Sequence, residues 1–217
     1  MKFQSHQAIW SYHCGIVNLN PSLDLSLLHT SNDGRFILAK LTLPSHEEFP
    51  TLYVLNLYAP AQNSSQERTN FFNSLIAFLL ATEGISDMLP HMLIGGDFNF
   101  SFDFALEHHT HRSFFPHNLV EFVGSHFLDC LNDPSNTSRS FVPTFQGPDG
   151  TGSCIDYFLA GHRLHPLCND GNTHYLNRRW TDHALLQIAL SFGLSSLGKG
   201  LWRGTPCWSS SLISWTS

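Results

Sequence analysis

The first third of the chain alternates short apolar runs with polar turns. Three runs rich in β-branched and aromatic residues cover residues 14–20, 36–43 and 52–58. Runs of this length and composition predict strands. The Asn-Asp-Gly sequence at 32–34 and the segment at Pro44 separate them as turns, and the stretch around Asp24 reads as a loop. A sheet whose strands follow one another without helices is therefore expected here.

The period of the apolar positions changes between residues 65 and 84. The positions that recur at helical spacing are Phe71, Phe72, Leu75, Ile76 and Leu79. Ser64 or Ser65 can cap the start of this helix, and Gly84 ends it. A second helix is predicted around residues 118–127. The apolar stripe of the first helix favours core packing over a cofactor-binding role.

Three further strands are predicted in the second half of the chain. They comprise the run that begins at Met92 and enters Gly95-Gly96, residues 153–160, and residues 184–192. Residues 194–217, rich in Ser, Gly and Trp, have no period and are interpreted as a linker-like tail after a domain at 1–193. Because strands outnumber helices and most follow one another directly, the pattern predicts an α+β fold or a layered α/β sandwich.

Composition narrows the function classes. A chain of 217 residues with 42% hydrophobic residues suits one large domain. The formal net charge of −6 argues against purely charge-driven nucleic-acid binding, although the fourteen histidines offset part of it below neutral pH. No run is long enough to span a bilayer and the N-terminus has no apolar signal segment, so no membrane partner is expected.

The cysteines are odd in number and widely spaced: Cys14, Cys130, Cys154, Cys168 and Cys207. This spacing is typical of reduced core or loop residues in an intracellular protein, and not of a disulfide framework or a zinc site. It does not separate cytoplasm from nucleus, and the sequence carries no signal for an oligomeric state.

Polar residues stand at the ends of four predicted strands: Asn56 and Tyr58, Asp97 and Asn99, Asp156, and Asp182 with His183. A carboxylate inside an apolar strand needs a partner, because burying it alone is costly. Histidine is the natural partner for a carboxylate, so Asp156 and His183 are predicted to form a couple if their strands are neighbours.

The remaining strand-end residues suit metal-assisted chemistry. Asp182 is a candidate ligand for a hard cation such as Mg²⁺. Asp97 and Asn99 are candidates to hold or deprotonate an attacking water. A second interpretation stays open for Gly95–Asn99, in which glycine gives the backbone its freedom and Asp97 and Asn99 only cap a turn.

Two polar segments have more than one interpretation. The His-rich run His108–Arg112 suits a solvated surface, a metal cluster or contact with a DNA backbone, and the surface is favoured. Arg178 and Arg179 form a local basic patch, for which phosphate contact and simple solvation are equally supported.

The motifs LNLYAP, GGDFN, SCIDYFL and WTDHALL, in this order, resemble the endonuclease/exonuclease/phosphatase superfamily from about Cys14 to Phe192. The segments DGRFILAKL and ERTNFF and the tail LGKGLWRGTPCW are similar to the endonuclease domain of LINE-type (non-LTR) retrotransposons. The resemblance implies a layered α/β sandwich of two mixed sheets flanked by helices, Mg²⁺ or Mn²⁺ as cofactor, and DNA nicking. It also implies a reverse transcriptase domain as partner in the ancestral polyprotein.

The resemblance also assigns roles. It implies that Asp97 activates water, Asn99 contacts the scissile phosphate, Tyr58 stabilises the phosphate or leaving group, Asp156 orients His183 on a non-bridging oxygen, and Asp182 binds metal. Asn56, Arg178 and Arg179 are candidate substrate contacts.

One departure from the family pattern changes the expectation. The family begins with an N-x-N strand, a helix and a strand that ends in a metal-binding Glu, and this sequence aligns from a point just after that Glu. Neither Asp24 nor the Glu47–Glu48 pair fits the motif. The expected product is a sandwich lacking its first strands, in which strands 14–20 and 36–43 each lose a neighbour and turnover is weak or absent. The alternatives are a non-catalytic retrotransposon remnant and a phosphodiesterase of the same fold that acts on a small phosphate ester.

Overall fold

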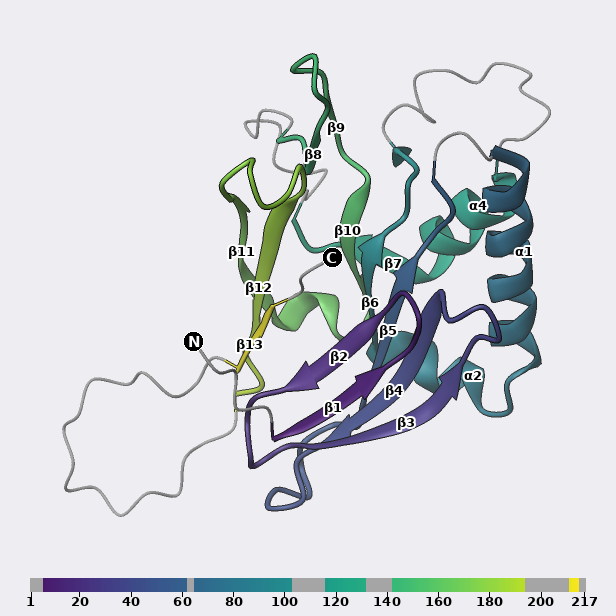
Figure 1. Cartoon of the computed structure of the whole chain (residues 1–217). Coiled ribbons are helices and arrows are strands. Elements are labelled where there is room, and N and C mark those ends of the chain that lie inside the picture. Colours follow the sequence, from purple (N-terminus) through teal and green to yellow (C-terminus); the bar gives the residue numbers. More distant parts are fainter. Residues whose placement is uncertain (1–5, 62–64, 103–115, 132–141, 194–210, 215–217) are drawn as a thin grey trace, which may run out of the picture.

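A computed structural model describes residues 6–61, 65–102, 116–131, 142–193 and 211–214 (Figure 1). The strands are β1 (Gln7–Trp10), β2 (Gly15–Asn18), β3 (Asp24–Thr30), β4 (Phe36–Thr42), β5 (Leu52–Tyr58), β6 (Met92–Asp97), β7 (Phe127–Asp129), β8 (Phe145–Gln146), β9 (Gly152–Ser153), β10 (Asp156–Gly161), β11 (Cys168–Tyr175), β12 (Ala184–Leu190) and β13 (Ser211–Ser214). The helices are α1 (Ser65–Ala81), α2 (Ile85–Met88) and α4 (His117–His126), with short 3-10 turns η1 (Leu89–His91) and η2 (His165–Leu167).

A six-stranded sheet in the order β3-β4-β5-β6-β10-β7 forms the middle layer. Strands β5 and β6 run parallel, and every other pair in this sheet is antiparallel. Helices α1, α2 and α4 lie on one side of the sheet, at the right of Figure 1. The hairpin β1-β2 and the antiparallel sheet β11-β12-β13 lie on the other side. The predicted layered α/β fold is confirmed, with a second layer made of two separate sheets.

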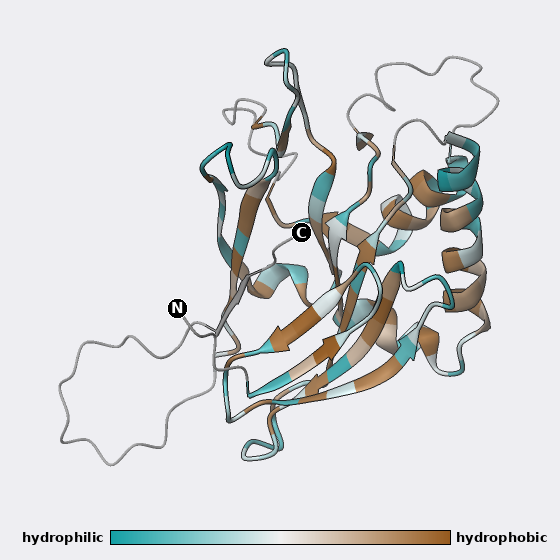
Figure 2. Cartoon of the chain, in the orientation of Figure 1, coloured by the Kyte–Doolittle hydropathy of each residue, from teal (hydrophilic) through white to brown (hydrophobic). Residues whose placement is uncertain are grey.

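Strand alternation builds a separate core on each face of the middle sheet, because successive side chains of a strand point to opposite faces. The side chains that face the helices include Leu38, Leu55, Ile94 and Leu159. The side chains that face the second layer include Ile37, Val54, Leu93 and Phe158. Figure 2 shows these central strands as largely hydrophobic and the connecting turns as hydrophilic. Both faces of the central strands β4, β5, β6 and β10 are therefore covered, and a polar side chain on either face of these strands needs a specific partner.

The described residues contain strands that the pattern missed, and one of them corrects the expectation of a lost neighbour. β3 begins at Asp24, in the stretch interpreted as a loop, and pairs with β4 on the side away from β5. The predicted loss of a neighbour at residues 36–43 is therefore wrong. Three consecutive residues of β3, Ser26–Leu28, are exposed, which obscures the alternation that marks a strand. β11 was missed because its sequence, CNDGNTHY, is almost entirely polar.

The structure describes one segment of the predicted tail and none of the His-rich run. Ser211–Ser214 pair with Gln187–Leu190 of β12, so a strand lies within the tail interpreted as a linker. The rest of that tail and His108–Arg112 lie outside the described residues. In the described ranges no single helix is long and apolar enough to cross a membrane, and only the pair Ser65–Ala81 and Ile85–His91, bent by 103°, passes on length and composition together.

Candidate active site

Three of the predicted site residues form one row across the middle sheet. Tyr58 of β5 lies opposite Asp97 of β6, and Asp97 lies opposite Asp156 of β10. By alternation these residues share the face of Val54, Leu93 and Phe158, which is covered by the second layer. Strand pairing therefore brings the two carboxylates together and points both toward the segment that carries His183.

Gly96 allows Asp97 to take its place in the row. Its φ of +134° is a value that residues with a side chain rarely adopt, and a Cβ there would collide with the carbonyl oxygen of Leu57. The close approach of β6 to β5 at the end of the strand thus depends on a glycine.

Asn99 fixes the carboxylate of Asp97. The backbone N–H of Asn99 donates to Oδ1 of Asp97 (2.7 Å), and its Nδ2 donates to Oδ2 of Asp97 (3.1 Å) and to the carbonyl of Ala59 (2.9 Å). Asn99 also has a positive φ of 48°, which Asn tolerates better than most residues. The capping interpretation of this segment is therefore correct, and it is compatible with a chemical role, since the cap orients a buried carboxylate.

Asp156 and His183 form the predicted couple. Nδ1 of His183 donates to Oδ2 of Asp156 at 2.9 Å and lies 3.1 Å from Oδ1. The Asp156 residue is only 7% exposed. The hydrogen bond connects the middle sheet to the start of β12, so it also joins two layers of the fold.

Thr144 holds both members of this couple, although no motif in the sequence pointed to it. Its buried Oγ1 accepts the backbone N–H groups of Ile155 and Asp156, both at 3.0 Å. Its carbonyl accepts the N–H of Ala184 at 2.7 Å, next to His183. One residue thus positions the start of β10 and the start of β12 together.

We expect Thr144→Val to destabilise the protein by about 1–3 kcal/mol, because it leaves two buried N–H groups without an acceptor while it keeps the side-chain shape. Urea unfolding followed by circular dichroism measures this change. Thr151→Val is the matched control, since Thr151 is exposed, and its effect should stay within about 0.5 kcal/mol. Equal effects of the two substitutions would contradict the positioning role.

The carboxylates of Asp97 and Asp156 lie close together in a buried site, beside His183. Burial, reinforced by the charge of Asp156, raises the pKa of Asp97 to about 7, against the opposing effects of the Asn99 N–H and of His183. The hydrogen bond to Asp156 raises the pKa of His183, and burial opposes it in part. Near neutral pH the group therefore carries a charge that a cation can stabilise.

The donor atoms fit a divalent cation. One ligand atom from each of Asp97, Asp156 and His183 lies within 4.8 Å of the others. Carboxylate oxygens are the ligands that Mg²⁺ and Mn²⁺ prefer, whereas an imidazole is more typical of ions such as Zn²⁺. Asp182, the predicted metal ligand, lies beside this group and not in it: its Oδ1 is 4.0 Å from Nε2 of His183 and its side chain is 61% exposed.

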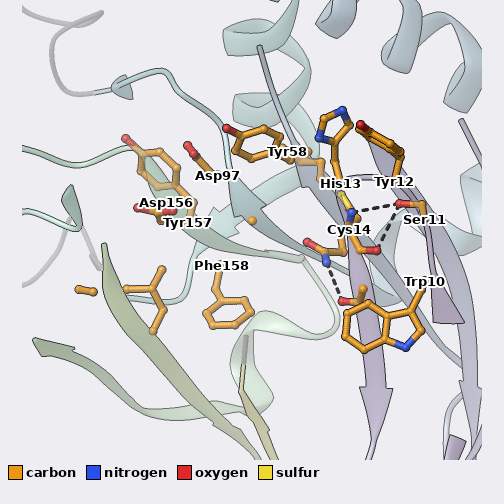
Figure 3. Close-up of a pocket in the computed structure, with 16 residues that line it drawn as sticks. Trp10, Ser11, Tyr12, His13, Cys14, Tyr58, Asp97, Asp156, Tyr157 and Phe158 are labelled. Carbon is orange, nitrogen blue, oxygen red and sulfur yellow. Dashed lines mark hydrogen bonds between the residues drawn. The ribbon is translucent and has the colours of Figure 1, made fainter. Parts of the chain in front are cut away.

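A pocket of about 260 Å³ opens beside the row. Figure 3 shows Tyr58, Asp97 and Asp156 along its upper part, with the rings of Trp10 and Phe158 below them. Asn56 lines it too, but its Nδ2 donates to the carbonyl of Gly15 at 2.9 Å. The pocket thus has carboxylates at one end and apolar walls at the other.

Four further side chains include the two arginines of the predicted basic patch and two residues that had no predicted role. The Arg178 guanidinium donates to the carbonyl of Gly147 at 3.0 Å, and Arg179 is exposed. His13, which no motif pointed to, stacks on Tyr58 with ring centroids 5.6 Å apart. Arg68 of α1, in the ERTNFF segment, is buried, and the nearby charge of Asp97 opposes the lowering of its pKa by burial.

No protein-family model and no curated protein matches the sequence. Solved structures do match the fold. The endonuclease domain of TRAS1, a telomere-specific non-LTR retrotransposon, is 12% identical with a TM-score of 0.57, over 82% of this chain and 76% of that one. An AP endonuclease from Archaeoglobus fulgidus is 17% identical with a TM-score of 0.56, over the same shares. The 3′ phosphatase NExo from Neisseria, bound to a product DNA hairpin, is 18% identical with a TM-score of 0.50, again over 82% and 76%. The chain therefore has the endonuclease/exonuclease/phosphatase fold.

Proposed function

We propose that the chain is a metal-dependent phosphodiester hydrolase of the retrotransposon endonuclease type, acting on DNA. The observation that carries the proposal is the buried group of Asp97, Asp156 and His183 on one side of the sheet, with its internal hydrogen bond of 2.9 Å. The similar structures include nucleases, and one of them was solved with a DNA product.

The carboxylates of Asp97 and Asp156, with Asp182 at the rim, are the oxygen ligands available for Mg²⁺ or Mn²⁺. A cation bound there would supply positive charge to the phosphate as negative charge grows on it. Asp97 accepts the proton of the attacking water, a role suited to a buried carboxylate that Asn99 holds in a fixed orientation. Asn99 keeps the Asp97 carboxylate oriented, and it contacts the phosphate only by exchanging one of its present hydrogen bonds.

His183 acts on the phosphate through its second nitrogen. Its Nδ1 is held by Asp156, so a proton on Nε2 is directed away from that couple and can be donated to a non-bridging oxygen. We assign to the hydroxyl of Tyr58, which lies one strand away from Asp97, the role of stabilising the phosphate or the leaving group. Of the two arginines, Arg179 is exposed and available to contact a flanking phosphate. Arg178 donates a hydrogen bond to the turn at Gly147.

Nicking of supercoiled plasmid tests the proposal. We expect the 217-residue chain to produce open circles in Mg²⁺ or Mn²⁺ and to stop when a chelator is added. Asp97→Ala should abolish this activity, while Glu121→Ala, an exposed carboxylate on α4, should leave it unchanged. Metal-independent nicking, or equal loss in both variants, would sink the proposal. Cleavage of a small phosphodiester but not of plasmid would point to the small-ester alternative.

We expect this nicking to be slow. The metal group in the described residues contains two carboxylates, and the resemblance assigns a further Glu that no described residue supplies there. Fewer carboxylates hold Mg²⁺ more weakly and neutralise the transition state less. An extended chain, preceded by a segment with the N-x-N strand and the Glu, should nick at least about tenfold faster. An unchanged rate in the extended chain, with the fold intact, would show that the two carboxylates suffice.

A further inference from the structure

Two thiols lie together at the joint between the middle sheet and the sheet β11-β12-β13. Cys130 directly follows β7, and Cys168 is the first residue of β11. Their Sγ atoms are 3.4 Å apart, although 38 positions separate them in the sequence. A disulfide bond is about 2.05 Å long, so the two sulfurs must move about 1.4 Å closer to form one.

Sheet pairing fixes the backbone on both sides of this contact. The N–H of Cys130 donates to the carbonyl of Phe158 in β10 at 2.8 Å. Cys168 pairs with Leu190 of β12. A Cβ added to Gly171 of β11 would lie 2.9 Å from the carbonyl oxygen of Cys130, so the two strands are packed closely. The proximity of the sulfurs is therefore a property of the fold.

The two thiols also differ in their electrostatic surroundings. The hydrogen bond from Cys130 lowers the pKa of the Cys168 thiol, and the same bond together with burial raises the pKa of Cys130. Both residues are partly exposed. Cys14 and Cys154 are buried, and burial raises the pKa of Cys14 to about 11. The thiolate is the nucleophile, so Cys168 is the more reactive member of the pair.

We propose that Cys130 and Cys168 are a redox-modification site that a small disulfide, such as oxidised glutathione, converts into an intramolecular disulfide. The Cys168 thiolate attacks one sulfur of glutathione disulfide, forms a mixed disulfide and releases one glutathione thiolate. Cys130 then loses its proton to solvent and attacks the Cys168 sulfur, which expels the second glutathione. Two protein thiols are oxidised and one glutathione disulfide is reduced.

The bridge would connect the same two sheets that the Asp156–His183 hydrogen bond connects. β7 pairs with β10, which carries Asp156, and β11 pairs with β12, which follows His183. Closing a loop across 38 positions restricts the unfolded chain strongly. We expect oxidation to raise Tm by roughly 10 °C.

The experiment uses the full chain carrying Cys207→Ser, because Cys207 lies outside the described residues. The folded protein is equilibrated in glutathione buffers of rising oxidising strength, and its peptides are mapped by mass spectrometry without reduction. We expect one bridge between Cys130 and Cys168, with loss of two hydrogen atoms and the rise in Tm. The Cys130→Ser variant should instead hold one glutathione at Cys168, and Cys14→Ala should behave like the parent chain. Phenylarsine oxide, which binds two adjacent thiols, should bind the reduced parent chain once and neither single-serine variant.

Three results would overturn the proposal. The first is a folded protein that gains glutathione but forms no bridge in the most oxidising buffer. The second is a bridge that forms only after unfolding in urea. The third is arsenical binding that survives in the Cys168→Ser variant, because the two thiols would then not be the binding pair.

Discussion

His183→Ala and Asp156→Ala should each lower the rate of metal-dependent plasmid nicking by at least about 100-fold in the 217-residue chain and in its extended form. His183 presents the proton of Nε2 to the phosphate only while Asp156 holds its Nδ1. Removing either residue therefore removes the oriented, charged imidazole. The measurement is the initial rate of open-circle formation, with the fold of each variant checked by circular dichroism.

A matched histidine and a conservative variant make this prediction specific. His174→Ala removes an exposed imidazole of β11 that contacts Gln187, and it should leave the rate unchanged. Asp156→Asn keeps the side-chain shape but removes the charge that raises the pKa of His183. We expect the alkaline limit of its residual activity to move to lower pH. A His183→Ala variant as active as His174→Ala would remove His183 from the mechanism.

Asp97→Asn should make the metal-free protein more stable at pH 8, by about 2 kcal/mol, which is roughly 4–8 °C in Tm. In the folded chain the pKa of Asp97 is raised from 3.8 to about 7, mainly by burial and by Asp156. A difference of this size corresponds to about 4 kcal/mol, and the hydrogen bonds that Asn99 donates to the carboxylate offset part of the gain from removing the charge.

The raised pKa of Asp97, together with that of His183, also determines how the stability of the fold depends on pH. Between about pH 4 and 7 the folded protein holds the Asp97 proton more tightly than the unfolded chain does, so stability falls as pH rises through this window. The raised pKa of His183 acts in the same direction: its favourable contribution is present below its unfolded value of 6.5 and is lost as pH rises through the raised value. Asp97→Asn should remove the first part of this slope and keep most of the second, because the charge of Asp97 contributes to the raised pKa of His183 less than the hydrogen bond to Asp156 does.

Thermal unfolding in a chelator from pH 5 to pH 9 measures both effects. Asp182→Asn is the control, because that side chain is 61% exposed and its charge should have little influence on stability. Mn²⁺ should raise the Tm of the parent protein and have a weaker effect on Asp97→Asn. A variant that is less stable than the parent at pH 8 would show that the Asp97 charge is already compensated without metal.

The elements whose apolar residues recur at a regular helical or strand spacing were the predictable part of the fold. The helix at residues 65–84 follows from Phe72, Leu75 and Leu79, and these side chains are buried in α1. β3 and β11 were not predicted because both expose much of their length, so apolar and polar residues do not alternate along them. Such a strand forms because it pairs with another strand. A short stretch of sequence does not contain that partner, so it cannot predict the strand.

The same distinction applies to the site. The Asp156–His183 couple was predictable because a carboxylate inside an apolar strand requires a partner, and a histidine stood at the start of the next apolar run. Thr144 was not, because its role comes from a tertiary position: it lies beside two-residue strands and binds backbone groups 11 and 12 positions away. The place of Asp182 outside the buried group depends on its exposure, which no spacing in the sequence reports.

The row of Tyr58, Asp97 and Asp156 has a consequence for how such a site can diversify. Its spacing is set by main-chain pairing between β5, β6 and β10, so it is independent of the loops at the ends of those strands. The turns of two neighbouring hairpins, at residues 11–14 and 147–151, can therefore change in length or sequence while Tyr58, Asp97 and Asp156 stay in register. In evolution or in the laboratory, substitutions in such turns can therefore alter substrate preference while the spacing of the three strand residues is kept.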